Sequence, residues 1–299
     1  MTGTYRLRRG IPDDTEACVR ILVAAVTDLG RRQGTSWEAD PADLRVRLGS
    51  MLDHLAHHAA EWWVAEDVSS GAPIGYARST DRDGLFELTE FFVHPDHQAA
   101  GLGADLLAHA FPDRRGEVRA IIATTDLRAQ SRYYRAGTVA RFPIVSMEVA
   151  APQPIAVASD AALVRATGDD LADLRRIDAA VLEYDRGEEF GWLVEDREGW
   201  LLRRDGVAVG YAFVGRHGSG PIATLDPDDQ LPLLALVESR AAALGVAPLT
   251  LEIPMHNGVA MRHLLDRGFR MDAFFTFLMS SRPFGQFDRY VVFGPPFIL

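Results

Sequence analysis

The feature that decides the fold is the segment Phe91-Phe92-Val93-His94-Pro95-Asp96-His97-Gln98-Ala99-Ala100-Gly101-Leu102-Gly103-Ala104. It begins at the end of an apolar, strand-like stretch, and an apolar helix is predicted after it, from Asp105 to Phe111. Gly101 and Gly103 lack the side chains that would keep an anionic group away from the backbone. The start of the helix directs its unpaired N–H groups to the same corner. The segment therefore predicts a site for a phosphate-bearing cofactor.

The spacing of the glycines distinguishes this corner from other phosphate sites. A dinucleotide site needs a third glycine at a fixed offset and an acidic residue about twenty residues further on, and a P-loop needs a Lys-Ser/Thr pair. Neither pattern follows here. The residues Val93-His94-Pro95 and Gln98-Ala99-Ala100-Gly101-Leu102-Gly103 instead match Val-x-Pro followed by Gln/Arg-x-x-Gly-x-Gly/Ala. In this pattern the chain resembles the GNAT-superfamily N-acetyltransferases.

The resemblance implies acetyl-CoA as co-substrate and indicates which residues bind it. In GNAT enzymes the cofactor lies beside the fourth strand, whose backbone N–H groups polarise the thioester carbonyl. The equivalent strand here is Leu85 to Val93, and the acetyl and pantetheine groups would face the backbone of Phe92 and Val93. The pyrophosphate would be held by the residues of the corner, which are Gln98, Ala99, Ala100, Gly101, Leu102, Gly103 and Ala104.

The chain carries one plan twice, which supports the resemblance independently. The segments Tyr5 to Asp14 and Gly75-Tyr76-Ala77 correspond to Leu163 to Asp170 and Gly210-Tyr211-Ala212. Prolines at positions 152 and 154 interrupt the pattern between the copies. We therefore predict two tandem GNAT-like domains, residues 1–150 and 159–299, of mixed α/β (α+β) class. Each would have a mostly antiparallel central sheet flanked by helices.

The two copies differ at the positions that carry the chemistry. The segments Asp126 to Thr138 and Asn257 to Phe269 both resemble the later GNAT motif Asn-x-x-Ala-x-x-x-Tyr-x-x-x-Gly-Phe, but the tyrosine is Tyr133 in the first copy and Leu264 in the second. In place of the glycine corner the second copy has residues 222–230, with three aspartates that would repel a pyrophosphate. We expect an acetyl-CoA-binding, catalytic first domain and a degenerate second domain that helps to shape the acceptor pocket.

Two side chains are candidates for proton transfer. Glu90 interrupts an apolar row of its strand, where partial burial would suit a general base working near neutral pH. The alternative is a glutamate paired with an arginine or with water at a sheet bulge, and Glu87 is the second choice as base. Tyr133 holds the position of the tyrosine that, by the resemblance, donates a proton to the departing thiolate. For Tyr133 the alternative is an aromatic core contact.

Composition limits the partners. A net charge of −11 argues against nucleic acid and favours cationic ligands, although solubility alone also explains it. The apolar runs are too short to span a bilayer and no signal peptide is visible, so we expect a cytoplasmic protein without a membrane partner. The single cysteine, Cys18, excludes a disulfide within the chain. His54, His57 and His58 share one helical face, but only Asp53 lies near them as a further ligand, so no metal is expected.

These features together predict an acetyl-CoA-dependent N-acetyltransferase. The acetyl group would pass directly to a primary amine, on a small molecule or a peptide, because no nucleophilic side chain is suggested for a covalent intermediate. Two alternatives stay open: an acetyl-CoA-binding regulator or scaffold without turnover, and a mycothiol-synthase-like tandem acetyltransferase whose second domain does the chemistry. The sequence also leaves a homodimer open and does not identify the acceptor.

Overall fold

The computed structural model describes residues 5–34, 39–98, 101–156, 159–295 and 298–299. The chain forms two compact units, one of Met1–Ile121 with Asp126–Thr138 and one of Ile122–Thr125 with Val139–Leu299. This division precedes the predicted domain boundary at residue 150, because strand β6 (Val139–Val149) pairs with strands of the second unit. Within the parts of the chain that the structure describes, no helix has the length and apolar content needed to cross a membrane.

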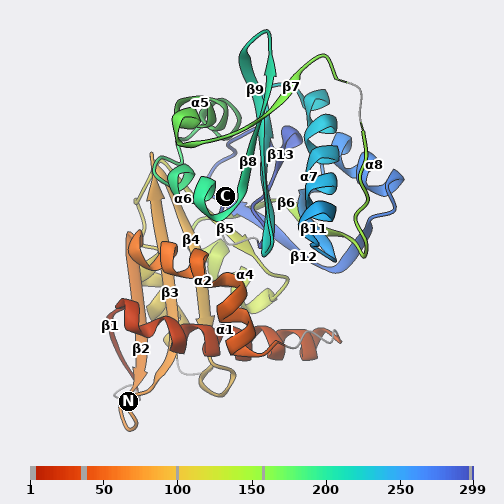
Figure 1. Ribbon diagram of the computed structural model, residues 1–299. Coiled ribbons are helices and arrows are strands. Elements are labelled where there is room, and N and C mark those ends of the chain that lie inside the picture. The colour runs from red at the N-terminus through yellow and green to blue at the C-terminus, as the bar shows by residue number, and fades with distance from the viewer. Residues whose placement is uncertain (1–4, 35–38, 99–100, 157–158, 296–297) are drawn as a thin grey trace. The chain divides into compact units, whose positions relative to one another are not determined.

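The first unit holds a sheet whose strands follow one another in space as in sequence (Figure 1). Its elements are β1 (Tyr5–Arg9), η1 (Pro12–Asp14), α1 (Thr15–Gln33), α2 (Pro41–His57), β2 (Glu61–Asp67), β3 (Pro73–Arg82), β4 (Leu85–Val93), η2 (Pro95–His97), α3 (Leu102–Ala110), β5 (Val118–Ala123, whose last two residues fall outside the unit) and α4 (Leu127–Arg135). Strands β1 to β4 are antiparallel, and β5 runs parallel to β4.

Local sequence explains the turn and the helix starts that shape this sheet. Asp83 and Gly84 join β3 to β4 with φ angles of 47° and 87°, the left-handed pair that a two-residue hairpin requires. Asp40 caps α2 by accepting a hydrogen bond from the backbone N–H of Ala42, and Pro41 occupies the first helical position. Strand β4 covers the predicted range Leu85 to Val93, whereas α3 begins at Leu102, before the predicted Asp105.

The second unit consists of two groups of antiparallel strands and four helices within its described residues (Figure 1). Strands β7 to β10 pair in sequence order, β13 pairs with β10, and β6 pairs with both β11 and β12. After β6 its elements are β7 (Ala162–Arg165), η3 (Gly168–Asp170), α5 (Leu171–Leu182), α6 (Glu189–Asp196), β8 (Glu198–Arg204), β9 (Val207–Gly215), β10 (Gly218–Thr224), η4 (Pro227–Asp229), α7 (Gln230–Leu244), β11 (Leu249–Pro254), α8 (Gly258–Asp266), β12 (Arg270–Ser280), η5 (Phe287–Arg289) and β13 (Tyr290–Val291).

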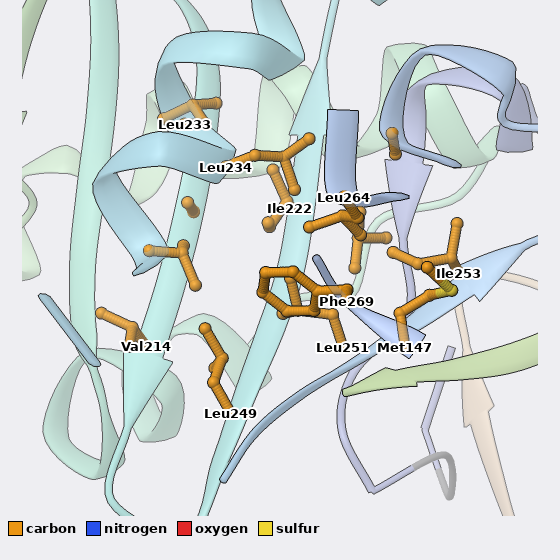
Figure 2. Packing of buried hydrophobic residues seen from close by; sticks show 14 of the residues in the cluster. Met147, Val214, Ile222, Leu233, Leu234, Leu249, Leu251, Ile253, Leu264 and Phe269 are labelled. Carbon is orange, nitrogen blue, oxygen red and sulfur yellow. The ribbon is translucent and has the colours of Figure 1, made fainter. Parts of the chain in front are cut away.

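One apolar cluster joins these strands and helices into a core. Figure 2 shows Leu233 and Leu234 of α7 facing Ile222 of β10, with Leu251 of β11 and Phe269 beside them. Every member of the cluster is buried, so it supplies the apolar area that stabilises the unit. The mixed α/β class expected from the sequence, with mostly antiparallel sheets flanked by helices, is confirmed.

Candidate active site

The site begins where β4 and β5 diverge. Parallel pairing between these strands runs from Leu85 opposite Val118 to Leu88 opposite Ile121, and among the described register positions it extends no further. Against β3, Arg78 lies opposite Glu90 and Ser79 opposite Leu88, so Thr89 is the extra residue of a β-bulge. From the bulge onward, β4 keeps its partner β3 on one side, and on the other side no strand of the described residues pairs with it, which leaves an open edge.

The register identifies which backbone groups lie along that edge. The N–H of His94 donates to the carbonyl of Ile74, which continues the β3–β4 pairing, at 2.9 Å. Because the backbone groups of a strand alternate between its two edges, those of Phe92 also face β3, whereas those of Phe91 and Val93 face the open edge. In agreement, the Val93 carbonyl accepts a hydrogen bond from Nε2 of Gln98 at 3.1 Å. Of the predicted pair Phe92 and Val93, only Val93 therefore presents its backbone to the edge, and Phe91 was missed.

Helix α3 starts beside this edge at the glycine corner. Gly101 is its N-cap and has a φ of 84°, the left-handed conformation that L side chains rarely adopt. A methyl group at Gly103 would lie 3.4 Å from Cζ of Phe91 and 3.7 Å from Nε of Arg132. Leu102 is buried and Ala104 is exposed, while Ala99 and Ala100 lie outside the described residues. The corner thus combines a helix start, an absent side chain and a nearby guanidinium, which together suit a phosphate.

Helix α4 brings Tyr133 to the same place. Its ring packs edge-on against Phe91, with the ring centroids 6.0 Å apart, and Phe91 in turn faces Gly103. Burial, together with the nearby carboxylate of Asp126, raises the pKa of the Tyr133 phenol. The phenol therefore stays protonated at neutral pH, which is the form that a general acid needs, while the higher pKa also makes it a weaker acid.

Glu90 has different surroundings from those of Tyr133. Its Oε2 lies 2.8 Å from Nη1 of Arg78, and its Oε1 accepts a hydrogen bond from the Tyr76 hydroxyl at 2.8 Å. Arg78 also donates to the carbonyl of Leu52 at 3.2 Å and stacks on Trp62, with its guanidinium carbon 4.1 Å from the ring centroid. These contacts favour the alternative of an arginine-paired glutamate at a bulge. Because neighbouring strand residues point to opposite faces, Glu90 and Phe91 lie on opposite faces of β4.

The remaining sequence-based candidates, Glu87 and the three histidines of α2 and its C-cap, already contact other residues. Glu87 is buried and its Oε2 accepts from Nη1 of Arg82 at 2.6 Å. The His54 and His58 rings contact each other at a tilt of 35° with centroids 4.5 Å apart, and Nδ1 of His57 lies 2.7 Å from the carbonyl oxygen of Asp53. Among the residues that the structure describes, no group of three or more His, Cys, Asp or Glu side chains could hold a metal ion.

Arg132 is a candidate site residue that the sequence did not reveal. The α4 motif specifies Tyr133 but not the residue before it, so no pattern marked an arginine there. Its place beside Gly103 depends on how α4 and α3 pack, which is a tertiary property. The structure thus brings together Phe91, Val93, Gly103, Arg132 and Tyr133, and it separates Glu90 from them.

Comparisons with known proteins agree with this geometry. Residues 58–137 match the family model described as an acetyltransferase (GNAT) domain. A protein from Pyrococcus horikoshii that carries the provisional name acetyltransferase superposes with a TM-score of 0.74 at 16% identity, over 97% of this chain and 94% of that chain. No curated protein matches the sequence significantly.

Two further solved structures share the fold over nearly their whole length. A GCN5-related N-acetyltransferase from Sphaerobacter thermophilus has a TM-score of 0.61 at 14% identity, over 97% of this chain and 99% of that chain. A tandem GNAT protein from the clavulanic acid biosynthesis pathway also has a TM-score of 0.61 at 14% identity, over 93% and 99% of the two chains. At these identities the similarity establishes the fold.

Proposed function

We propose that this chain, a tandem GNAT-fold protein with an acetyltransferase (GNAT) domain match at residues 58–137, binds acetyl-CoA in its first unit and transfers the acetyl group to a primary amine. One observation carries the proposal. The glycine-lined start of α3, the open edge of β4 and the protonated phenol of Tyr133 meet around the ring of Phe91.

The residues present fit the co-substrate. Gly103 leaves space beside Phe91 and Arg132 that a side chain would fill, and the unpaired N–H groups of α3 face an incoming anion. These groups, with Gln98 holding the end of β4, would bind the pyrophosphate. The backbone groups of Phe91 and Val93 would bind the pantetheine arm and the acetyl carbonyl along the open edge.

The chain's own residues would then perform two tasks. When bound, acetyl-CoA supplies an activated thioester carbonyl. Backbone N–H groups along the open edge of β4 would stabilise the negative charge that develops on its oxygen. Tyr133 would donate its phenolic proton to the departing thiolate, and burial keeps that proton in place until then.

The amine acceptor and its base are proposals of the same kind. The net charge of −11 suits an acceptor that arrives as a cation, either a small molecule or a peptide amine. Glu90 was predicted to remove the ammonium proton, but its contacts with Arg78 and Tyr76 favour a residue that positions the bulge of β4.

The test is an acetyl-CoA turnover screen over a panel of amines, with release of free thiol as readout. We expect at least one amine to raise thiol release clearly above the rate without acceptor. If acetyl-CoA binds and no amine in the panel raises the rate, the chain is an acetyl-CoA-binding regulator or scaffold instead.

A further inference from the structure

Strand β10 of the second unit has the position that β4 has in the first. The N–H of Leu225 donates to the carbonyl of Val209 at 2.8 Å, just as the N–H of His94 donates to that of Ile74 at 2.9 Å. The repeated Gly-Tyr-Ala segments follow directly after Ile74 and Val209. By this register, Ile222 and Thr224 correspond to Phe91 and Val93, whose backbone groups form the open edge of β4.

In the second unit this edge is occupied by the end of the chain. Tyr290 and Val291 of β13 pair antiparallel with Ala223 and Ile222 of β10. The next residue, Val292, continues along the same path, and its N–H donates to the carbonyl of Glu252 in β11 at 3.0 Å. A strand of this protein therefore lies between β10 and β11, where the first unit has an open edge.

Glycines of β10 make this close approach possible. A methyl group at Gly218 would lie 2.0 Å from the carbonyl oxygen of Gly294, and one at Gly220 would lie 2.5 Å from that of Val292. Both distances are too short for a real Cβ atom, so side chains at these positions would expel the C-terminal strand. The glycines of β10 thus admit a peptide backbone, as Gly103 leaves space beside β4.

The start of α7 also binds this strand. Nε2 of Gln230, the first residue of α7, donates to the carbonyl of Asp288 at 3.1 Å, and Nδ2 of Asn257 donates to the carbonyl of Tyr290 at 3.1 Å. Gln230 and Asn257 are both fully buried, and the hydrogen bond from Asn257 is shielded from water, whereas the one from Gln230 is partly buried. At the position of the glycine corner, side chains of the second unit therefore donate hydrogen bonds to main-chain carbonyls of the C-terminal segment.

We propose that residues 286–294 are an internal ligand of the second unit: they take the strand edge and helix start that the first unit offers to acyl-CoA, and they close the second unit to that ligand. The comparison of this edge with an acyl-CoA site rests on the proposed function. The pairing of residues 290–292 along the edge does not depend on it. The predicted repulsion by three aspartates is a weaker reason for the loss, because Asp229 is paired with Arg204 at 2.8 Å.

The test uses the full chain with a protease recognition sequence inserted between Arg282 and Pro283. After cleavage, a fluorescent peptide of residues 283–299 should bind the cut chain by exchanging with the original segment. The peptide should bind the uncut chain at least about 100-fold more weakly than the cut chain, because the tethered segment competes at a millimolar effective concentration. A Val292→Pro peptide, which lacks the N–H donated to Glu252, should lose binding, and an Asp288→Ala peptide should retain it.

Equal binding to cut and uncut chains would overturn the proposal.

Hydrogen exchange on intact chains tests the proposal even if cleavage unfolds the second unit. Gly218→Ala should speed the exchange of the Val292 and Gly294 amides by about tenfold or more, while Gly191→Ala, with open space around it, should not. Unchanged exchange in Gly218→Ala would also overturn it. Neither experiment measures acetyl transfer, so failure here is distinguishable from failure of the proposed function.

Discussion

Tyr133 is the residue on which the proposed proton transfer depends. Its buried ring packs on Phe91, so Tyr133→Phe keeps the aromatic contact and removes only the proton donor. We expect kcat to fall by about a hundredfold, the range of general acid catalysis, with little change in the affinity for acetyl-CoA. Steady-state kinetics with calorimetric binding checks this. Tyr134→Phe is the matched control, because Tyr134 is half exposed; an unchanged kcat in Tyr133→Phe would remove the proposed acid.

Glu252 gives the second unit a pH-dependent stability. Burial, opposed by a hydrogen bond from Ser146 and aided by Asp272, raises the pKa of Glu252 from 4.5 to about 7. The folded state therefore keeps a proton that the unfolded state loses, and the free energy of unfolding falls as pH rises from 4.5 to about 7. The loss over this window is on the order of 3 kcal/mol.

Glu252→Gln should remove this contribution, because an amide keeps the acceptor for Ser146 and does not titrate. Denaturant unfolding at pH 5 and pH 7.5 should show a smaller loss of stability in the variant than in the wild type. Equal slopes in the two proteins would mean that Glu252 ionises normally in the fold.

At the scale of elements, replacing either of the two glycines at the start of α3 with alanine should change stability in opposite directions. Gly101 has a φ of 84°, so Gly101→Ala should lower the free energy of unfolding by about 1 kcal/mol. Gly103 is inside the helix without a positive φ, and its new methyl would make only ordinary contacts, so Gly103→Ala should raise that free energy by about 0.5 kcal/mol. Urea unfolding of both variants measures the difference, and a destabilised Gly103→Ala would contradict it.

The ion pair between β3 and β4 tests the role of Glu90. Removing one partner of a buried pair leaves an uncompensated charge, so Glu90→Gln should cost about 3 kcal/mol of stability. The double variant Arg78→Met/Glu90→Leu should cost less than the sum of its single variants, as a double-mutant cycle would show. If Glu90→Gln instead keeps its stability and loses kcat, Glu90 acts as the base and does not merely position the bulge.

The elements also show how far sequence alone could reach. The bounds of β4 and the positions of Gly101 and Tyr133 followed from an apolar run and two spaced motifs. The bulge at Thr89, which places Glu90 opposite Arg78, depends on strand register. The position of Arg132 beside Gly103 depends on helix packing. Neither property leaves a periodic pattern, and a bulge reverses the alternation on which the assignment of strand faces depends.

For the whole molecule, the asymmetry between its two copies is the main conclusion. The sequence predicted that only the first copy keeps the cofactor corner, from the missing Gly-x-Gly and from local charge. It could not predict that β13, far along the chain, fills the equivalent edge in the second copy. Such pairing joins residues distant in sequence, and only the folded structure shows it.

The most direct test of a single acetyl-CoA site at the glycine corner is a calorimetric titration of acetyl-CoA into the full chain and into Gly103→Glu, because the motif accepts only Gly or Ala at this position. We predict one binding site per chain, in the first unit, and an affinity at least about tenfold lower in Gly103→Glu, whose carboxylate would repel the pyrophosphate. Equal affinities in the two proteins, or two sites per chain, would contradict a single acetyl-CoA site at the glycine corner.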